Sequence, residues 1–202
     1  MKLYDTTMAP NPRRVRIYLA EKGIEVPMEQ VDLGNMAHKS DAFVKLNPLM
    51  RVPVLELDDG TCISESMAIC RYFEETQPEP PLFGRDPKEK ALVEMWNRRV
   101  ELNVYNAVAA AFRHGNPGMA EREEQVAGWA EVNQRRAPEM FDFLDASLGD
   151  SKYFVGDYFS IADISALITV DFARVIKLRI GEQHKNLARW HADVSGRPSA
   201  KA

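Results

Sequence analysis

Apolar and polar residues alternate with a changing period over the first 76 residues of the chain. Short alternating runs bounded by glycine, proline or aspartate predict strands, and apolar residues three and four apart predict helices. The predicted elements are a strand at 2–4, a helix beginning at Arg13, a strand at 26–32, a short helix at 41–46, a hairpin over 52–63 and a helix from 67 to 73. This order, β-α-β-(α)-β-β-α, predicts a small α/β domain.

The helix beginning at Arg13 shows a division of residue types. Val15, Ile17 and Leu19 supply its apolar side, and Gly23 ends it. The charged residues of the segment are expected on the outside; they are Arg13, Arg14, Arg16, Glu21 and Lys22. The preceding residues, 5–12, are expected to form a polar loop bounded by proline.

Beyond residue 77 the pattern is helical throughout. The proline-stiffened stretch 77–81 is the best candidate for a domain boundary. We therefore expect an α/β domain at 1–77, a linker at 78–86 and an all-helical domain at 87–202. The predicted helices of the second domain run from about 87 to 114, 119 to 148, 161 to 175 and 182 to 195. The third of these helices, 161 to 175, is apolar on nearly every face. At its start, Ser160 and Asp163 have the spacing of an N-cap and an acidic N3 residue.

Composition and charge narrow the class of protein. The chain has 202 residues, of which 45% are hydrophobic and 28% charged, and its formal net charge is −4. The charge and the lack of a basic stripe argue against a nucleic-acid partner, and no apolar run reaches the ~18 residues of a membrane span. Cys62 and Cys70 are too few for a disulfide framework. Without an export signal at the start, we expect a soluble, cytoplasmic protein.

Val52-Pro53 is the first pair with a bearing on function. Proline lacks the N–H that an interior strand residue donates. If the bond between them is cis, the N–H and C=O of Val52 are left to pair with an extended, peptide-like ligand. The alternative is an edge strand that tolerates proline.

Ser64-Glu65-Ser66 is the second feature, because it precedes a helix. Free N–H groups at a helix start, together with a serine hydroxyl, form an anion site. Ser66 could therefore hold the carboxylate of an α-amino acid, and Glu65 its ammonium group. The alternative is an ordinary N-cap.

These residues lie in a recognisable segment. NPLMRVPVLELDDGTCISESMAICRYFEE resembles the glutathione-binding stretch of the cytosolic glutathione transferases, which read N-P-x-x-x-V-P-x-L followed by E-S-x-A-I-x-x-Y. HKSDAFVKLNP upstream and VGDYFSIADI downstream extend the resemblance to nearly the whole chain. It implies a thioredoxin-like N-terminal domain joined to an all-helical domain, with glutathione as co-substrate and no metal.

The resemblance also implies roles for individual residues. Val52, ahead of a cis Pro53, is expected to pair with the cysteinyl part of glutathione. Glu65 and Ser66 are expected to hold the γ-glutamyl end. The glycine carboxylate is expected near basic or polar side chains, namely His38, Lys39 and Arg51; a solvated charged surface is the alternative for these three.

The chain departs from the family pattern at the residue that activates the thiol. Ala9 stands where the family usually has Ser or Cys, and alanine cannot donate a hydrogen bond. The chain therefore resembles members that lack the N-terminal Ser, Tyr or Cys. Thr6, Thr7 and Asn11 are candidate donors in the same loop, and Asn11 resembles the asparagine of a bacterial subset with disulfide-bond reductase activity. The alternative for Asn11 is a helix cap.

Two further candidates for the group that activates the thiol lie outside that loop. Tyr4 matches the strand-end tyrosine of some mammalian classes, although a core aromatic is the better interpretation. His114 ends a long helix and resembles a histidine-bearing segment of fungal transferases, in which it could hold a water near the thiolate; the alternative is a cation at a helix C-terminus. Met8, the helix face near Tyr105 and Phe112, and His114 are expected to line the electrophile pocket.

The sequence thus predicts a glutathione transferase that joins the glutathione thiolate to a small hydrophobic electrophile. A glutathione-dependent disulfide reductase or peroxidase is the first alternative, favoured by Asn11. A non-catalytic binding or regulatory relative is the second, favoured by Ala9. Members of this family usually dimerise, so a homodimer is expected.

Overall fold

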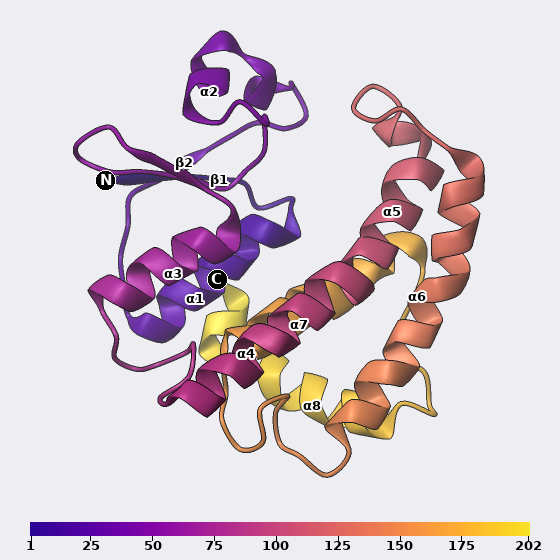
Figure 1. The fold of residues 1–202 in the computed structure, drawn as a ribbon. Coiled ribbons are helices and arrows are strands. Elements are labelled where there is room, and N and C mark those ends of the chain that lie inside the picture. Colours follow the sequence, from indigo (N-terminus) through magenta and orange to yellow (C-terminus); the bar gives the residue numbers. More distant parts are fainter. The chain divides into compact units, whose positions relative to one another are not determined.

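A four-stranded sheet in the order β2-β1-β3-β4 organises the first of two structural units. The computed structural model describes residues 1–202, which separate into Met1–Pro81 with Pro198–Ala202 and, as the second unit, Leu82–Arg197. Each unit is described by itself, and Figure 1 labels their elements. The first contains β1 (Lys2–Asp5), α1 (Pro10–Lys22), β2 (Met28–Gln30), η1 (Ala37–Lys39), α2 (Asp41–Leu46), β3 (Val54–Glu56), β4 (Cys62–Ser64), α3 (Ser66–Thr76) and, at the chain end, η5 (Pro198–Lys201).

The sheet confirms the predicted crossover and hairpin. β1 pairs with β2 in parallel, and β3 pairs antiparallel with both β1 and β4. Because strand side chains alternate between faces, Tyr4 and Val54 lie on the face that Phe43 of α2 covers. Figure 1 shows α1 and α3 on the opposite side of the sheet.

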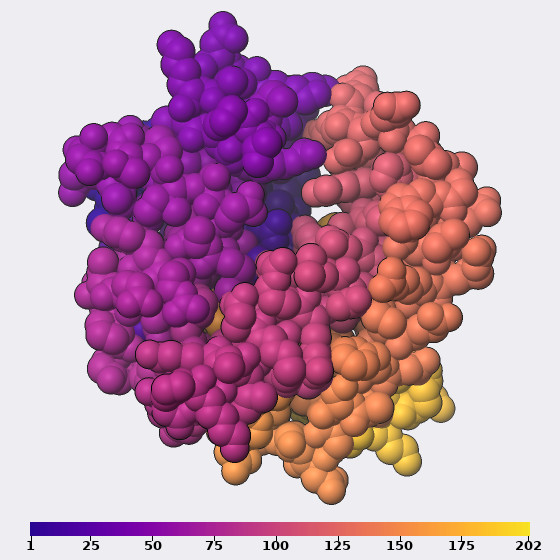
Figure 2. All heavy atoms as spheres, viewed as in Figure 1, coloured from indigo at the N-terminus to yellow at the C-terminus, as the bar shows by residue number.

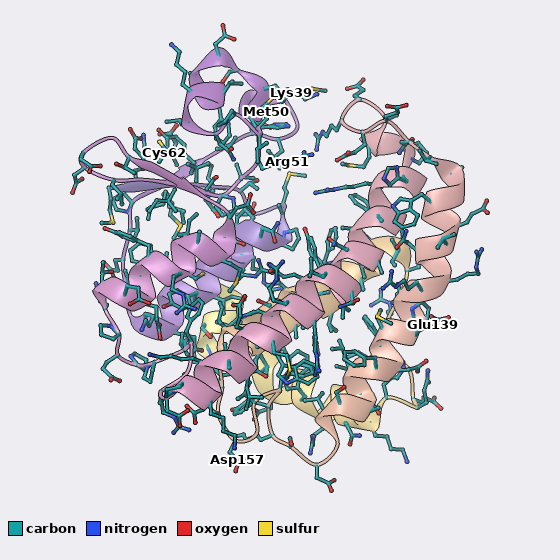
Figure 3. All side chains as sticks on the ribbon, viewed as in Figure 1. Lys39, Met50, Arg51, Cys62, Glu139 and Asp157 are labelled. Carbon is teal, nitrogen blue, oxygen red and sulfur yellow. The ribbon has the colours of Figure 1, made fainter.

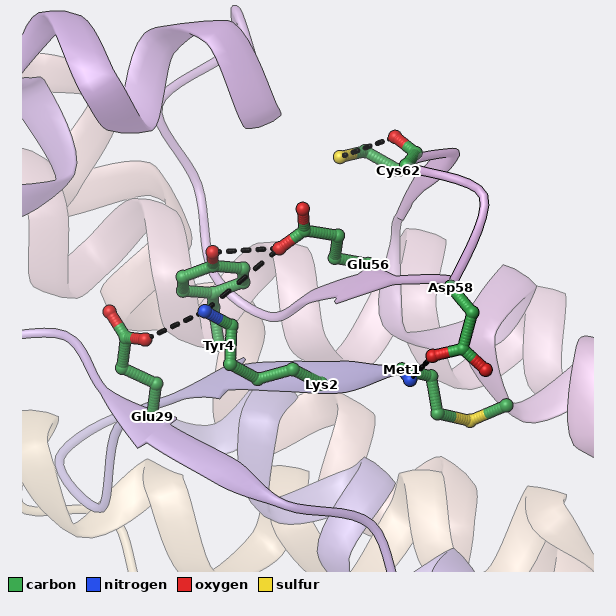
Figure 4. A network of polar contacts seen from close by, with 8 residues as sticks. Met1, Lys2, Tyr4, Glu29, Glu56, Asp58 and Cys62 are labelled. Carbon is green, nitrogen blue, oxygen red and sulfur yellow. Dashed lines mark hydrogen bonds and ion pairs between the residues drawn. The ribbon is translucent and has the colours of Figure 1, made fainter.

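Tyr4 of β1 is a core aromatic, as the sequence indicated. Its ring is buried and meets Phe43 edge-on at 6.0 Å between centroids. Its hydroxyl donates to the carboxylate of Glu56 at 2.9 Å, and Lys2 lies between Glu56 and Glu29 (Figure 4). The proton of the Tyr4 hydroxyl is therefore donated within the sheet, to Glu56.

α1 differs from the prediction in two ways. It begins at Pro10 rather than Arg13, because proline fits the first turn of a helix, where its missing N–H costs nothing. The expectation that all charged residues face solvent is wrong for Arg14 and Lys22, which are 1% and 7% exposed. Both lie where α1 packs on α3, and Lys22 is paired there with Glu74 at 2.8 Å.

The last residues of the chain pack with the α/β unit. Arg13 donates to the carbonyl of Ala200 at 3.0 Å, and Ser199 donates to Glu21. Residues 198–202, which the sequence pattern grouped with the helical domain, therefore lie against α1. The pattern gave no sign of this packing, because it depends on two polar contacts between residues far apart in the chain.

The second unit is helical throughout. It contains α4 (Pro87–Arg99), the π-helix η2 (Val100–Tyr105), α5 (Asn106–Gly115), η3 (Pro117–Met119), α6 (Ala127–Leu148), α7 (Ile161–Phe172), η4 (Ala173–Ile176) and α8 (Lys185–Ser195). α6 begins at Ala127 rather than 119, because side chains hold the preceding loop: Gln125 donates to the carbonyls of Arg113 and Asn116 at 2.8 and 2.6 Å. α7 is buried from residue 161 to 170 and is central, as predicted.

The start of α7 confirms the predicted capping box. Ser160 caps the helix, and Asp163 accepts hydrogen bonds from the Ser160 N–H, the Phe154 N–H and the Trp190 indole at 3.0, 3.1 and 3.0 Å. Asp163 is fully buried, and this burial raises the pKa of its carboxyl group to about 6. One carboxylate thus links α7, α8 and the loop before them.

None of the helices is both long and apolar enough to cross a lipid bilayer.

Candidate functional site

The N-terminus of α3 is left without a side-chain cap. Glu65 occupies the N-cap position with φ 71° and ψ 116°, and its side chain makes no capping hydrogen bond. A positive φ is costly for a residue with a Cβ, by roughly 1–3 kcal/mol, and such conformations concentrate at functional sites. Ser66 is the first helical residue rather than a cap, so the structure rules out the ordinary N-cap for these residues.

Ser66 is fixed from behind by a buried arginine. Its side chain is almost fully buried, and its Oγ accepts one hydrogen bond, from the Nη1 of Arg14 at 2.6 Å. No other hydrogen bond involves this hydroxyl. The proton of Ser66 therefore has no acceptor within the chain and can be donated to a ligand.

The segment that leads to Val52 exposes backbone groups. The Val52–Pro53 peptide bond is cis, and the N–H and C=O of Val52 take part in no backbone hydrogen bond. Asn47, which is buried, holds the preceding loop by donating to the carbonyl of Arg51 at 2.8 Å and accepting from the Leu49 N–H at 3.1 Å. An extended peptide could pair with Val52.

The N-terminus of α1 also lacks a cap. Ala9 is the N-cap residue and has no side chain that could accept a hydrogen bond. Pro10 and Pro12 have no N–H, so Asn11 carries the only N–H of the first three helical positions. Asn11 lies inside the helix rather than ahead of it and is half-buried; Thr7 lies in the exposed turn before it.

The three residues predicted to meet a carboxylate differ in exposure. His38 is buried in η1, whereas Lys39 and Arg51 are exposed. Lys39 and Arg51, both labelled in Figure 3, lie in the segments before and after α2. The region of α2 thus presents two cationic side chains to solvent.

His114 lies near the end of α5 in the helical unit. Its Nδ1 accepts a hydrogen bond from the N–H of Val126, the N-cap residue of α6, at 3.2 Å. In the neutral ring the proton is therefore on Nε2. The side chain is half-buried, so that the imidazole both fixes the loop before α6 and retains one N–H donor.

Partly exposed aromatic rings form a cluster in the same unit. Tyr105 stacks on Phe172 at 6.0 Å between centroids, and Phe112 meets Phe172 edge-on at 5.6 Å. All three rings are only partly buried. The structure therefore brings together Tyr105 and Phe112, as expected of one wall, whereas Met8 belongs to the other unit and is 78% exposed.

Comparison with known proteins identifies the family. A model of the glutathione S-transferase N-terminal domain matches residues 9–76, and one of the glutathione S-transferase C-terminal domain matches residues 80–198. The chain belongs to the glutathione S-transferase family. The predicted family and fold class, a thioredoxin-like domain and an all-helical domain, are confirmed.

Relatives within this family match along the whole chain. Glutathione S-transferase 2 of Saccharomyces cerevisiae is 37% identical and covers 100% of this chain and 88% of its own length. The crystal structure of Gtt2 from the same yeast has a TM-score of 0.94 at 38% identity, covering 100% of this chain and 99% of its own. A class Gtt2 transferase of Vibrio parahaemolyticus has a TM-score of 0.88 at 39% identity, covering 100% and 96%.

Sequence reasoning missed two residues that contact the candidate site residues. The sequence pattern predicts that Arg14 faces solvent, and only the structure shows its contact with Ser66. Phe172, at the end of α7, contacts both Tyr105 and Phe112. Because α7 is apolar on nearly every face, its sequence does not distinguish this ring from the core residues. A charged residue between the apolar residues of an amphipathic helix, as in Arg14-Val15, was the available signal for the first.

Proposed function

We propose that the α/β unit binds glutathione at the start of α3. The observation that carries this proposal is the uncapped N-terminus at Glu65-Ser66, with a Ser66 proton that has no acceptor within the chain. Ser66 would donate to the α-carboxylate of the γ-glutamyl group, and Glu65 would accept from its ammonium group. Val52 would pair its backbone with the cysteinyl residue of the peptide.

The other end of glutathione would meet the segments around α2. Lys39 and Arg51 are exposed cations that can hold the glycine carboxylate, and buried His38 would support them from η1. Charge attraction at exposed positions is modest, so these side chains would tune affinity rather than determine it.

We propose that the thiol is activated at the start of α1. The helix N-terminus carries partial positive charge, which favours a thiolate over a thiol. The backbone or side-chain amide of Asn11 is the proposed donor, with the Thr7 hydroxyl as a second. The thiol proton would pass to solvent, and the thiolate sulfur would form a bond to the electrophilic carbon of the second substrate. In a substitution the bond to the leaving group breaks and that group departs with its electron pair; in an addition the resulting anion takes a proton from water.

The second substrate is proposed to be a small, hydrophobic electrophile. Tyr105, Phe112 and Phe172 present partly exposed rings, and aromatic surfaces of this kind favour flat apolar molecules. His114, in the same unit, would offer its Nε2–H to a bound water. Rate enhancement would come from bringing the reactants together and from the lowered thiol pKa.

Calorimetry with glutathione, combined with ultraviolet absorbance of the bound thiolate, tests this proposal. We expect Ser66→Ala to weaken binding at least tenfold, because a hydrogen bond to a charged group is lost. Asn11→Ala should raise the pKa of the bound thiol with a smaller effect on binding. Thr76→Ala, which removes a hydroxyl at the other end of α3, is the matched control and should bind normally.

Absence of binding at millimolar glutathione would contradict the proposal and favour a non-catalytic relative. A second activity, reduction of disulfides or peroxides by glutathione, is favoured by one observation: Asn11 offers an amide donor in the first turn of α1, whereas Ala9, at the usual position of the serine or cysteine, offers none. A panel of aromatic electrophiles and small disulfides separates the two. Disulfide reduction without aromatic conjugation would reverse their order.

We further propose a homodimer formed through the helical unit. Leu102, Trp129 and Val132 are 51%, 48% and 43% exposed, and apolar side chains that gather on one surface mark an interaction site. Trp129 and Val132 lie three residues apart on α6, whose outer surface Figure 2 shows in salmon to orange, and Arg136 of α6 bonds to Asn103 beside Leu102. Trp129→Glu should yield monomers in analytical ultracentrifugation, whereas Glu131→Gln should not; a dimeric Trp129→Glu would contradict the proposal.

A further inference from the structure

Arg14 is an unusual residue for the buried side of α1. Its side chain is 1% exposed, and its Nη1 lies 2.6 Å from the Oγ of Ser66 on α3. Burying a guanidinium is costly unless it is hydrogen-bonded. A methionine or leucine would fill the same space between two helices at no such cost, so packing alone does not account for an arginine here.

The contact fixes the direction of the Ser66 hydroxyl group. A serine hydroxyl can donate one hydrogen bond and accept two, and its proton rotates to suit its neighbours. An arginine can only donate, and it stays charged at all physiological pH values. Ser66 must therefore accept from Arg14, and its own proton is directed to another acceptor, with no competing acceptor in the chain.

We infer that Arg14 is a positioning residue that makes Ser66 a dedicated donor and so selects a ligand with a carboxylate at this point. The inference rests on the proposed glutathione site and deepens it. The α-carboxylate of the γ-glutamyl group is the acceptor that Ser66 would meet, and the guanidinium behind Ser66 polarises the O–H bond toward it. Arg14 itself does not touch the ligand.

Two peptide analogues separate the effect of the carboxylate from that of the amine. 4-Aminobutyryl-cysteinylglycine lacks only the α-carboxylate of glutathione, and glutaryl-cysteinylglycine lacks only the α-amine. We expect the wild-type chain to bind glutathione roughly 10- to 100-fold more tightly than the 4-aminobutyryl peptide, because one charge-assisted hydrogen bond is lost. In Arg14→Met this preference should fall to within about threefold, whereas the preference over the glutaryl peptide should be unchanged.

Four further variants test whether Arg14 acts through Ser66. Ser66→Ala should lose the same preference, and adding Arg14→Met to it should cause no further loss, since both residues act through one hydroxyl. Arg14→Lys, which keeps the charge and a donor, should retain part of the preference. Lys22→Met is the matched control: it removes another buried cation between α1 and α3, and it should leave both preferences intact.

The outcomes distinguish this inference from the proposed function. A wild-type chain that binds neither glutathione nor the analogues contradicts the proposed function itself. A wild type that prefers the carboxylate, with Arg14→Met and Arg14→Lys that prefer it equally, overturns the role of Arg14 alone. Equal loss of both preferences in Arg14→Met would show a general collapse of the site and would also overturn it.

If Arg14→Met does not fold, a measurement on the wild-type chain still tests the role of Arg14. The buried Nη–H groups of Arg14 should give slowly exchanging signals in nuclear magnetic resonance spectra. Glutathione and the glutaryl peptide should both shift these signals, because each places a carboxylate on Ser66, and the 4-aminobutyryl peptide should not. Equal shifts with all three peptides would overturn the inference.

Discussion

Two helices of this chain begin in opposite ways. At the start of α7, Ser160 and Asp163 form a closed capping box, and Asp163 also bonds to Trp190 of α8. At the start of α3, Glu65 provides no cap and holds a positive φ, and the Ser66 hydroxyl proton has no partner. At both starts the first N–H groups have no acceptor within the helical hydrogen-bond pattern, and both carry the same partial positive charge.

The difference shows how one local motif serves stability or binding. A helix start satisfied from within the chain lowers the free energy of the folded state, and it has nothing left to offer a ligand. A start left open sacrifices that stabilisation and keeps donors for an anion. α1, with Ala9 as an N-cap that cannot accept, resembles α3 in this respect. Both open starts belong to the unit in which we propose the glutathione site.

The largest effect on stability is expected from removing the carboxylate acceptor at the start of α7. Asp163→Ala leaves the buried N–H groups of Phe154, Ser160 and Trp190 without their acceptor, which should cost about 3–5 kcal/mol of unfolding free energy. Urea denaturation followed by tryptophan fluorescence measures this loss. Asp163→Asn, which keeps one oxygen, should lose less, and a loss under about 1 kcal/mol for alanine would mean that the box is dispensable.

The same carboxylate should give the fold a pH dependence. Burial raises the pKa of Asp163 to about 6, from an ordinary value of 3.8. Between these values the folded state keeps a proton that the unfolded chain has released, so this group stabilises the fold most fully below pH 3.8 and loses the contribution as the pH rises through about 6. The loss amounts to up to about 3 kcal/mol.

Denaturation of the wild type and Asp163→Asn from pH 4 to 7 checks this dependence. The stability of the wild type relative to the asparagine variant should fall as the pH rises, because the variant does not titrate at this position. The comparison cancels the titration of groups that both chains share. A constant difference across the range would show that Asp163 ionises normally in the folded chain.

The contrast between the two starts also marks how far sequence reasoning reaches. The capping box was predictable because Ser160 and Asp163 are three residues apart and act locally. The hairpin and the crossover were predictable from period and turn residues. Each of these features depends on neighbours in the chain.

The candidate site was only partly predictable, because its key contacts join distant residues. The spacing of Glu65 and Ser66 indicated an anion site, but the choice between a cap and an open start needed the backbone angles. Arg14 and Ser66 lie 52 residues apart, and a charged residue on α1 is by default expected to face solvent. Phe172 joins Tyr105 and Phe112 only through the packing of three helical segments.

A smaller effect, of opposite sign on stability and binding, is expected at Glu65. Glu65→Gly relieves the positive φ and should raise the unfolding free energy by up to about 1 kcal/mol, while the loss of the carboxylate weakens glutathione binding about tenfold. Denaturation and calorimetry on one preparation measure both. Glu65→Ala keeps the strain and should lose affinity without gaining stability. A destabilised glycine variant would show that Glu65 holds the fold and not only the ligand.

The smallest effect tests whether an open start can be closed. Ala9→Ser places a hydroxyl at the N-cap of α1, where Asn11 carries the one N–H within reach, since Pro12 has none. We expect the unfolding free energy to rise by about 0.5–1 kcal/mol, and Ala9→Val, which has no acceptor, to give no gain. If the start of α1 also faces the thiol, the serine proton should lower the pKa of bound glutathione below that of the wild type. A gain in stability without that change would separate the two roles and place thiol activation on Asn11 alone, whereas no gain at all would mean that the start of α1 is already satisfied and that only α3 is open.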